Sequence, residues 1–182
     1  MKLIPTLIII TLMFSFHKKE GIKPTVFNET ETDTIVIGDI NNDKIIDTAF
    51  VKGPKWVNEE DGWGDPKFYN INISFSCNVP NITNDNAVGA YVENIGDIDN
   101  DGFSEIIVVP GWWIGCWGRL HFYTFKKGKW KHLDYAERNV CEDDNYKQYI
   151  TKINNHKIKI IEQVWDEDEA DRIEKPKFII VK

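Results

Sequence analysis

Apolar and polar residues alternate along several short stretches of this chain. The pattern is clearest at 68–77, at 119–133 and at 146–165. Alternation with a period of two predicts half-buried β-strands. The second and third stretches each contain a short turn sequence, Lys127-Gly128 and Asn154-Asn155, so each predicts a β-hairpin. No stretch shows a sustained helical period, and the chain is therefore expected to be mainly β.

Two stretches of the chain match each other. The first is IVIGDINNDKIIDTAFV at 35–51 and the second is ENIGDIDNDGFSEIIVV at 93–109. They align without gaps, and a glycine, the acidic residues and the final valine fall at the same places. Each reads as a strand, an acidic loop and a second strand. A match that covers the loop and both flanks predicts an internal repeat.

The acidic loop of the second stretch has the composition of a calcium site. Calcium takes six to eight oxygen ligands at about 2.3–2.6 Å. A short loop supplies them from alternate side chains, then from a main-chain carbonyl, and then from a later acid. In the second loop these groups are Asp97, Asp99, Asp101, the carbonyl of Phe103, and Glu105. Gly102 stands where the loop must turn sharply and positive φ is easiest.

The residues after the second loop exclude two helical types of calcium loop. An EF-hand needs a bidentate Glu where this chain has Val108, and both EF-hand and dockerin-like loops continue into a helix. The sequence EIIVVPGWW has instead the β-branched density of a strand. The loops resemble the FG-GAP or VCBS-type repeat, the calcium-loop blade of integrin-like β-propellers and of many exported bacterial proteins. The resemblance is confined to the two matching stretches, 35–51 and 93–109.

This resemblance implies that both loops bind Ca²⁺. The implied ligands are Asp97, Asp99, Asp101 and Glu105 in the second loop, and Asp39, Asn41, Asp43, the carbonyl of Ile45 and Asp47 in the first. The first loop departs from the pattern, because Asn41 removes one charge and Lys44 replaces the turn glycine. A non-glycine residue at positive φ costs about 1 kcal/mol, and an ammonium group repels a cation. We expect the first site to be the weaker one. The alternative is that the acids form solvated turns.

The chain is too short to close a propeller, which needs at least about four blades of four strands. It has 182 residues and two such loops. We expect a compact antiparallel β-domain at 21–182, built on two duplicated strand–calcium loop–strand units.

The N-terminal segment at 1–20, MKLIPTLIIITLMFSFHKKE, predicts export. Its apolar stretch is as long as a signal-peptide core and shorter than the roughly 20 residues that span a bilayer. It is either a cleaved signal peptide or a retained N-terminal anchor, and the alternative is a buried first strand or helix. We expect a periplasmic, cell-surface or extracellular protein that meets a membrane only through this segment, if it is retained.

Three cysteines allow at most one internal disulfide in an exported chain. Cys116 and Cys141 flank the predicted hairpin at 119–133 and are the preferred pair. The two other pairings remain open. With the preferred pair formed, Cys77 is a free thiol within its strand.

Charge and motifs restrict the function further. The net charge is −7 with no basic patch, which argues against nucleic-acid binding. Two calcium ions would bring the charge to −3. The chain contains no nucleophile elbow, no zinc-protease motif and no phosphate-binding glycine loop. We therefore expect a non-enzymatic binding or surface module whose partner is a protein or a glycan.

A tryptophan-rich stretch, PGWWIGCWGRL, offers a second possibility. Trp112, Trp113 and Trp117 either fill a core or stack on sugar rings. Adjacent strand residues point to opposite faces, so one of Trp112 and Trp113 is expected near the surface. A carbohydrate-binding module that uses these side chains is the first alternative. A glycoside hydrolase-like enzyme with a pair of carboxylates is the second.

Overall fold

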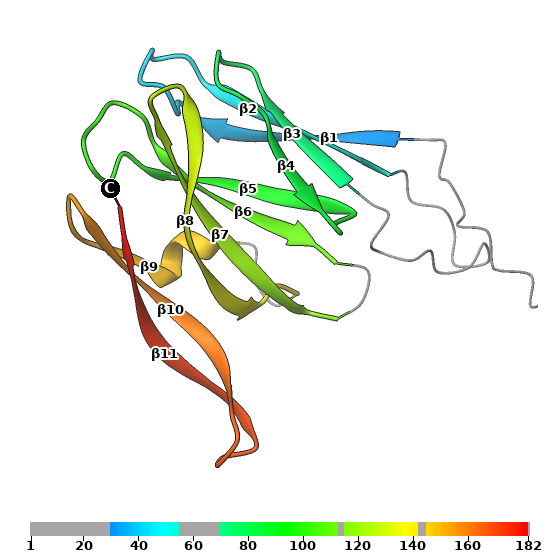
Figure 1. Cartoon of the computed structure of the whole chain (residues 1–182), viewed down its shortest axis with the longest axis vertical. Coiled ribbons are helices and arrows are strands. Elements are labelled where there is room, and N and C mark those ends of the chain that lie inside the picture. The colour runs from blue at the N-terminus through cyan, green and yellow to red at the C-terminus, as the bar shows by residue number, and fades with distance from the viewer. Residues whose placement is uncertain (1–29, 55–69, 113–114, 142–144, 182) are drawn as a thin grey trace, which may run out of the picture.

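The computed structural model describes residues 30–54, 70–112, 115–141 and 145–181, and these residues form three antiparallel sheets (Figure 1). The first sheet contains β1 (Thr30–Gly38), β2 (Asp47–Pro54), β3 (Asn70–Phe75) and β4 (Ile82–Asp85) in that order. The second contains β5 (Gly89–Gly96), β6 (Glu105–Gly111), β7 (Trp117–Lys126) and β8 (Lys129–Asn139). The third contains β9 (Ile150–Asn154), β10 (Lys157–Asp166) and β11 (Asp171–Ile180), with β10 in the middle. The expected mainly β, open architecture is confirmed. The predicted signal segment at 1–20 lies outside the described residues.

The second sheet lies between the other two, and its strand β6 is buried on both faces. On β6, Ile106 and Val108 belong to the core shared with the first sheet, whereas Ile107 and Val109 belong to the core shared with the third. A continuous apolar run is the pattern of a strand that is buried on both faces. The run IIVV is therefore apolar throughout because β6 packs against a core on each face. Burying each such side chain stabilises the fold by about 1.5–3 kcal/mol.

Both predicted hairpins are present, but the turn of the second is Asn155-His156 rather than the predicted Asn154-Asn155, because Asn154 is the last residue of β9. Lys127 and Gly128 both have positive φ, 51° and 79°, as a two-residue turn matched to the strand twist requires. The second predicted hairpin is β9–β10, but its strand begins at Ile150 rather than at 146, because Tyr146–Tyr149 forms a 3₁₀ turn. Tyr146 is buried there against the ring of Tyr91. Its packing takes precedence over the alternating pattern.

A disulfide joins Cys116 and Cys141 across the open end of the β7–β8 hairpin, with Cα atoms 5.0 Å apart. This is the preferred pairing from the sequence. Cys77 is a free, half-buried thiol. In the described part of the chain, no helix is long and apolar enough to cross a bilayer.

Candidate metal centre

The two acidic loops join β1 to β2 and β5 to β6, and the same hydrogen bonds shape both. In each loop the two carboxylate oxygens of the first aspartate accept the main-chain N–H groups of the residues four and five positions later, and Asp39 also accepts that of Asn41 at 3.2 Å. The later donors are Asp43 and Lys44 to Asp39, at 3.2 and 2.7 Å, and Asp101 and Gly102 to Asp97, at 3.1 and 3.0 Å. A carboxylate held in this way faces the inside of its own loop and holds the chain in a tight curve.

Both loops need left-handed backbone at two positions. In the first loop Asn42 and Lys44 have φ of 59° and 71°, and in the second Asn100 and Gly102 have φ of 62° and 94°. Lys44 therefore has the positive φ that the alignment predicted, at a cost of about 1 kcal/mol relative to glycine. The positive φ of Asn42 and Asn100 was not predicted from the sequence, although Asn tolerates this conformation better than most residues.

The acid that closes each loop is the first residue of the following strand, and it is buried. Asp47 and Glu105 are each 1% exposed. One oxygen of each accepts a main-chain N–H from the start of its own loop, Ile40 to Asp47 at 3.0 Å and Ile98 to Glu105 at 2.7 Å. The other oxygen accepts a hydroxyl from the neighbouring strand segment, Ser76 to Asp47 at 3.1 Å and Thr124 to Glu105 at 2.7 Å.

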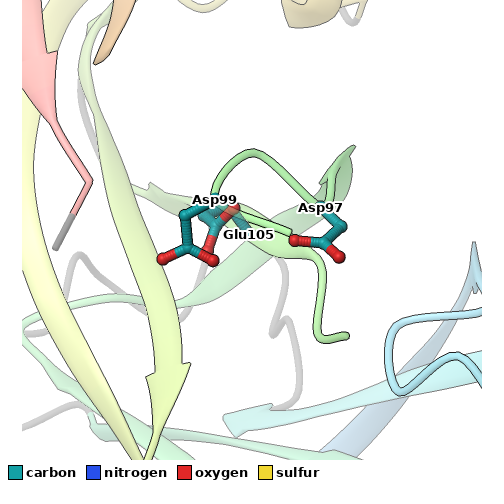
Figure 2. A group of neighbouring side chains, drawn as sticks. All are labelled: Asp97, Asp99 and Glu105. Carbon is teal, nitrogen blue, oxygen red and sulfur yellow. The ribbon is translucent and has the colours of Figure 1, made fainter. Parts of the chain in front are cut away.

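Three acidic side chains converge in the second loop (Figure 2). One oxygen from each of Asp97, Asp99 and Glu105 lies within 4.8 Å of the others. Oxygens bound to a single calcium ion lie at most about 5 Å apart, which is twice the calcium–oxygen bond length. The spacing therefore fits a shared cation. Asp101 is close to this group, because its carboxylate approaches the same lysine as Asp99 does.

Asp99 is the least satisfied of these acids. Its side chain is 3% exposed, and within the described residues its oxygens accept no hydrogen bond from a main-chain N–H or a hydroxyl group. The ammonium group of Lys126 contacts Asp99 Oδ2 and lies 3.7 Å from Asp101 Oδ2. The pairing of this ammonium with the Asp99 side chain is the main cause that raises the pKa of Lys126. A buried carboxylate needs a positive partner, and the donor set of this loop fits a hard divalent cation.

The electrostatics of Glu105 lead to the same conclusion. The pKa of Glu105 is raised to about 7, mainly by burial and also by the negative charges of Asp99 and Asp101, although the hydrogen bonds from Thr124 and Ile98 act to lower it. Four carboxylates at this density repel one another. A divalent cation at the loop would favour the ionised form of all of them.

The first loop is less well arranged for a cation. Within the described residues its acids do not form a converging group of three like that of the second loop. Asn41 takes the place of Asp99, and its amide donates to Asp43 Oδ2 at 2.9 Å. The geometry therefore favours the expectation that the first loop binds a cation more weakly than the second.

Ile45 and Phe103 are the residues predicted to supply main-chain carbonyls, one in each loop. The side chain of Ile45 is 66% exposed, and that of Phe103 packs on Phe125.

The predicted aromatic ligand site is not assembled as one surface. Trp112 is 40% exposed just after β6, and Trp113 lies outside the described residues. The ring of Trp117 is covered by the guanidinium group of Arg172 at 3.9 Å. One face of this ring is therefore covered within the fold, and Trp117 is half-buried, whereas Trp112 is exposed.

Sequence reasoning missed the groups that support the acids from other strands. Ser76, Thr124 and Lys126 all come from segments well beyond the loops whose acids they contact. No local pattern marks them, since a hydroxyl in an alternating strand is common. No protein-family model, curated protein or solved structure matches the chain.

Proposed function

We propose that this protein is a calcium-binding β-domain in which the second acidic loop holds Ca²⁺ between neighbouring strands. The observation that carries the proposal is the buried carboxylate of Asp99, whose only partner in the described part of the chain is the Lys126 ammonium group and which lies beside the converging oxygens of Asp97 and Glu105. The oxygen-only donor set favours calcium, and magnesium suits a loop this rich in protein oxygens less well. The kinship with FG-GAP or VCBS-type repeats is part of this proposal.

The ion has a structural role in this proposal. The acids are brought together only by folding, so an ion that binds the folded state stabilises it by mass action. The protein then acts as a non-enzymatic binding or surface module outside the cytoplasm. The Cys116–Cys141 disulfide supports an oxidising compartment.

The test is thermal unfolding with calcium or with EDTA. Calcium at 100 times its dissociation constant should add about 2.7 kcal/mol to the free energy of unfolding. Asp101→Asn should remove most of this response while keeping an oxygen for the N–H of Phe103, which Asp101 accepts at 3.0 Å. The matched control is Asp168→Asn, an exposed acid in the β10–β11 turn. A melting curve that EDTA leaves unchanged in the parent protein would overturn the proposal.

A carbohydrate-binding role is the second candidate, and a cleft supports it. The cleft has a volume of about 270 Å³ and is lined by acids and aromatic rings, among them Glu31, Asp33, Tyr91 and Tyr146. It also includes Gly111, the residue before the exposed Trp112. Tryptophan fluorescence during titration with polysaccharides tests this role, and Trp112→Ala should abolish the signal.

The same cleft bears on the hydrolase alternative. Glu31 and Asp33 lie close together on β1 and are both exposed. A glycosidase general acid depends on an environment that raises its pKa, usually burial. Two exposed carboxylates favour ligand binding over hydrolysis.

A further inference from the structure

Lys126 is the last residue of β7 and precedes the two-residue turn to β8. Its side chain is 32% exposed, whereas the side chain of Asp99 that it contacts is 3% exposed. The ammonium group therefore reaches the acidic loop from the solvent side. It contacts a buried carboxylate that has no other hydrogen-bond donor among the described residues.

The first loop has no counterpart of the Asp99 carboxylate and no counterpart of the Lys126 ammonium group. Asn41 stands in place of Asp99, and its own amide group donates to Asp43. Within the described residues, no ion pair involves an acid of the first loop. The extra carboxylate of the second loop and the lysine that neutralises it therefore occur together, and the loop without one also lacks the other.

An ammonium group and a calcium ion cannot both occupy this position. Calcium must approach its oxygen ligands to about 2.3–2.6 Å, and Asp99 Oδ2 is the atom that Lys126 contacts. An ammonium group and a calcium ion that contact the same carboxylate would also repel each other. Lysine is a flexible, strongly hydrated side chain, so Lys126 can return to solvent when a stronger cation arrives.

We propose that Lys126 is a built-in counter-cation of the second loop, which calcium displaces when it binds. This inference rests on the proposed calcium-binding function. In the absence of calcium, Lys126 holds the acids together and keeps the loop folded. When calcium is present, the same contact sets how much calcium is needed to load the loop.

The direct test is calcium titration by isothermal calorimetry on the full chain. Lys126→Gln removes the charge and keeps a side chain of similar reach. It should lower the calcium dissociation constant about tenfold, a change of about 1.4 kcal/mol in binding free energy. Lys126→Arg keeps the charge and should stay within about twofold of the parent protein, a change of at most about 0.4 kcal/mol.

The matched control is Lys129→Gln. Lys129 is the cross-strand partner of Lys126 on the same turn and is exposed, and no ion pair joins it to the loop acids within the described residues. It gives the same change in net charge, so a long-range effect of charge would appear here as well. Its dissociation constant should change less than about twofold at about 0.15 M salt, where the Debye length is about 8 Å.

Thermal unfolding supplies a second readout. In EDTA, Lys126→Gln should melt at a lower temperature than the parent, because the acids lose their counter-cation. Saturating calcium should close this gap, because calcium takes over that role. A structural lysine unrelated to the cation site would leave a gap that calcium does not close.

The outcomes separate this inference from the proposed function. Calcium binding by the parent protein with an unchanged or weaker affinity in Lys126→Gln overturns the role of Lys126 and leaves calcium binding intact. Calcium binding by Lys126→Gln, with no measurable binding by the parent protein, supports the inference most strongly. If neither protein binds calcium, the proposed function fails and the displacement of Lys126 fails with it.

Discussion

The side-chain amide of Asn94 donates a hydrogen bond of 3.2 Å to the main-chain carbonyl of Asp39, so the second sheet holds the first acidic loop in place. The same relationship recurs in the second acidic loop, where Lys152 Nζ donates to the carbonyl of Asp97 at 3.3 Å. The third sheet thus holds the second loop. Each loop is stabilised by the sheet that follows it in the chain.

The third sheet repeats the strand pairing without the loop. In the first two sheets, the residues on either side of the loop pair across it, Gly38 with Asp47 and Gly96 with Glu105, and each pair follows a register shift. In the third sheet Asn154 pairs with Lys157 beside a similar shift, and only the dipeptide at 155–156 lies between them. A lysine stands where the buried acid would be. The β9–β10 turn therefore offers no comparable acidic loop for a cation.

The contact between Asn94 and the first loop predicts a measurable contribution to stability. Asn94→Ala removes the hydrogen bond to Asp39 and also the bond that Asn94 Oδ1 accepts from the N–H of Gly96 at 2.7 Å. The expected loss is about 1–3 kcal/mol, since each net hydrogen bond contributes about 0.5–1.5 kcal/mol. Urea unfolding followed by circular dichroism measures it. Asn72→Ala, at an exposed position on β3, is the control, and equal losses in the two variants would contradict the assignment.

The sequence predicted the parts of this structure that depend on neighbouring residues. Alternation located the hairpins, Lys127-Gly128 located their tightest turn, and the acidic spacing located both loops. The preferred cysteine pair followed from the hairpin that it flanks. Each of these features is encoded within a short stretch of chain, so a local pattern can report it.

The remaining features depend on which strands become neighbours in space. Lys126 lies on the second strand after the loop that holds Asp101, and nothing in its own surroundings indicates an acidic partner. Trp117 was a candidate for sugar binding, but the contact that covers it comes from Arg172 on a different sheet. Tyr146 continues an alternating pattern and still leaves the strand, because its ring packs on Tyr91. Tertiary packing decides such positions.

The disulfide predicts a large effect of reduction. Cys116 and Cys141 have a sequence separation of 25, and a loop of that length is expected to contribute about 3–4 kcal/mol in the chain-entropy model. The double variant Cys116→Ser/Cys141→Ser should lose this amount in urea unfolding, and adding a reductant should then have no further effect. Thiol counting in denaturant should find a single free thiol in the parent, Cys77. A full set of free thiols, one for every cysteine, would contradict the pairing.

Gly53→Ala should destabilise the protein through a steric clash, and Gly89→Ala is the matched control. A Cβ added at Gly53 would lie 2.8 Å from the main-chain oxygen of Val88 and 3.2 Å from the side chain of Ile71. Overpacking of this kind costs about 1–3 kcal/mol, because the backbone oxygen cannot move away freely. Gly89→Ala meets nothing within 4 Å and should be nearly neutral. Thermal melting of both variants measures the difference, and similar shifts would mean that the first and second sheets are not packed this closely.

His121 predicts a loss of stability in mild acid. Burial and, to a smaller extent, the positive charges of His132 and Arg119 together lower the pKa of His121 to about 4 from its usual 6.5. His132 Nε2 lies 3.1 Å from His121 Nδ1, and the ring of Tyr135 lies 6.0 Å from that of His121. The unfolded chain takes up a proton on this histidine near pH 6.5, whereas the folded protein resists until about pH 4. Stability from this group is therefore present above pH 6.5 and is lost as the pH falls towards 4.

The change expected from His121 is about 1–2 kcal/mol across that window, after an allowance for its partial exposure to solvent. His121→Gln should flatten the pH dependence of the free energy of unfolding between pH 6.5 and 4, and the exposed His156→Gln should not. Urea unfolding at pH 7, 6, 5 and 4 in EDTA compares the two variants with the parent protein. Other titrating groups, including Glu105, are the same in all three proteins, so the difference between curves isolates one side chain. Parallel curves for the parent protein and His121→Gln would mean that His121 already takes up its proton near pH 6.5 in the folded state.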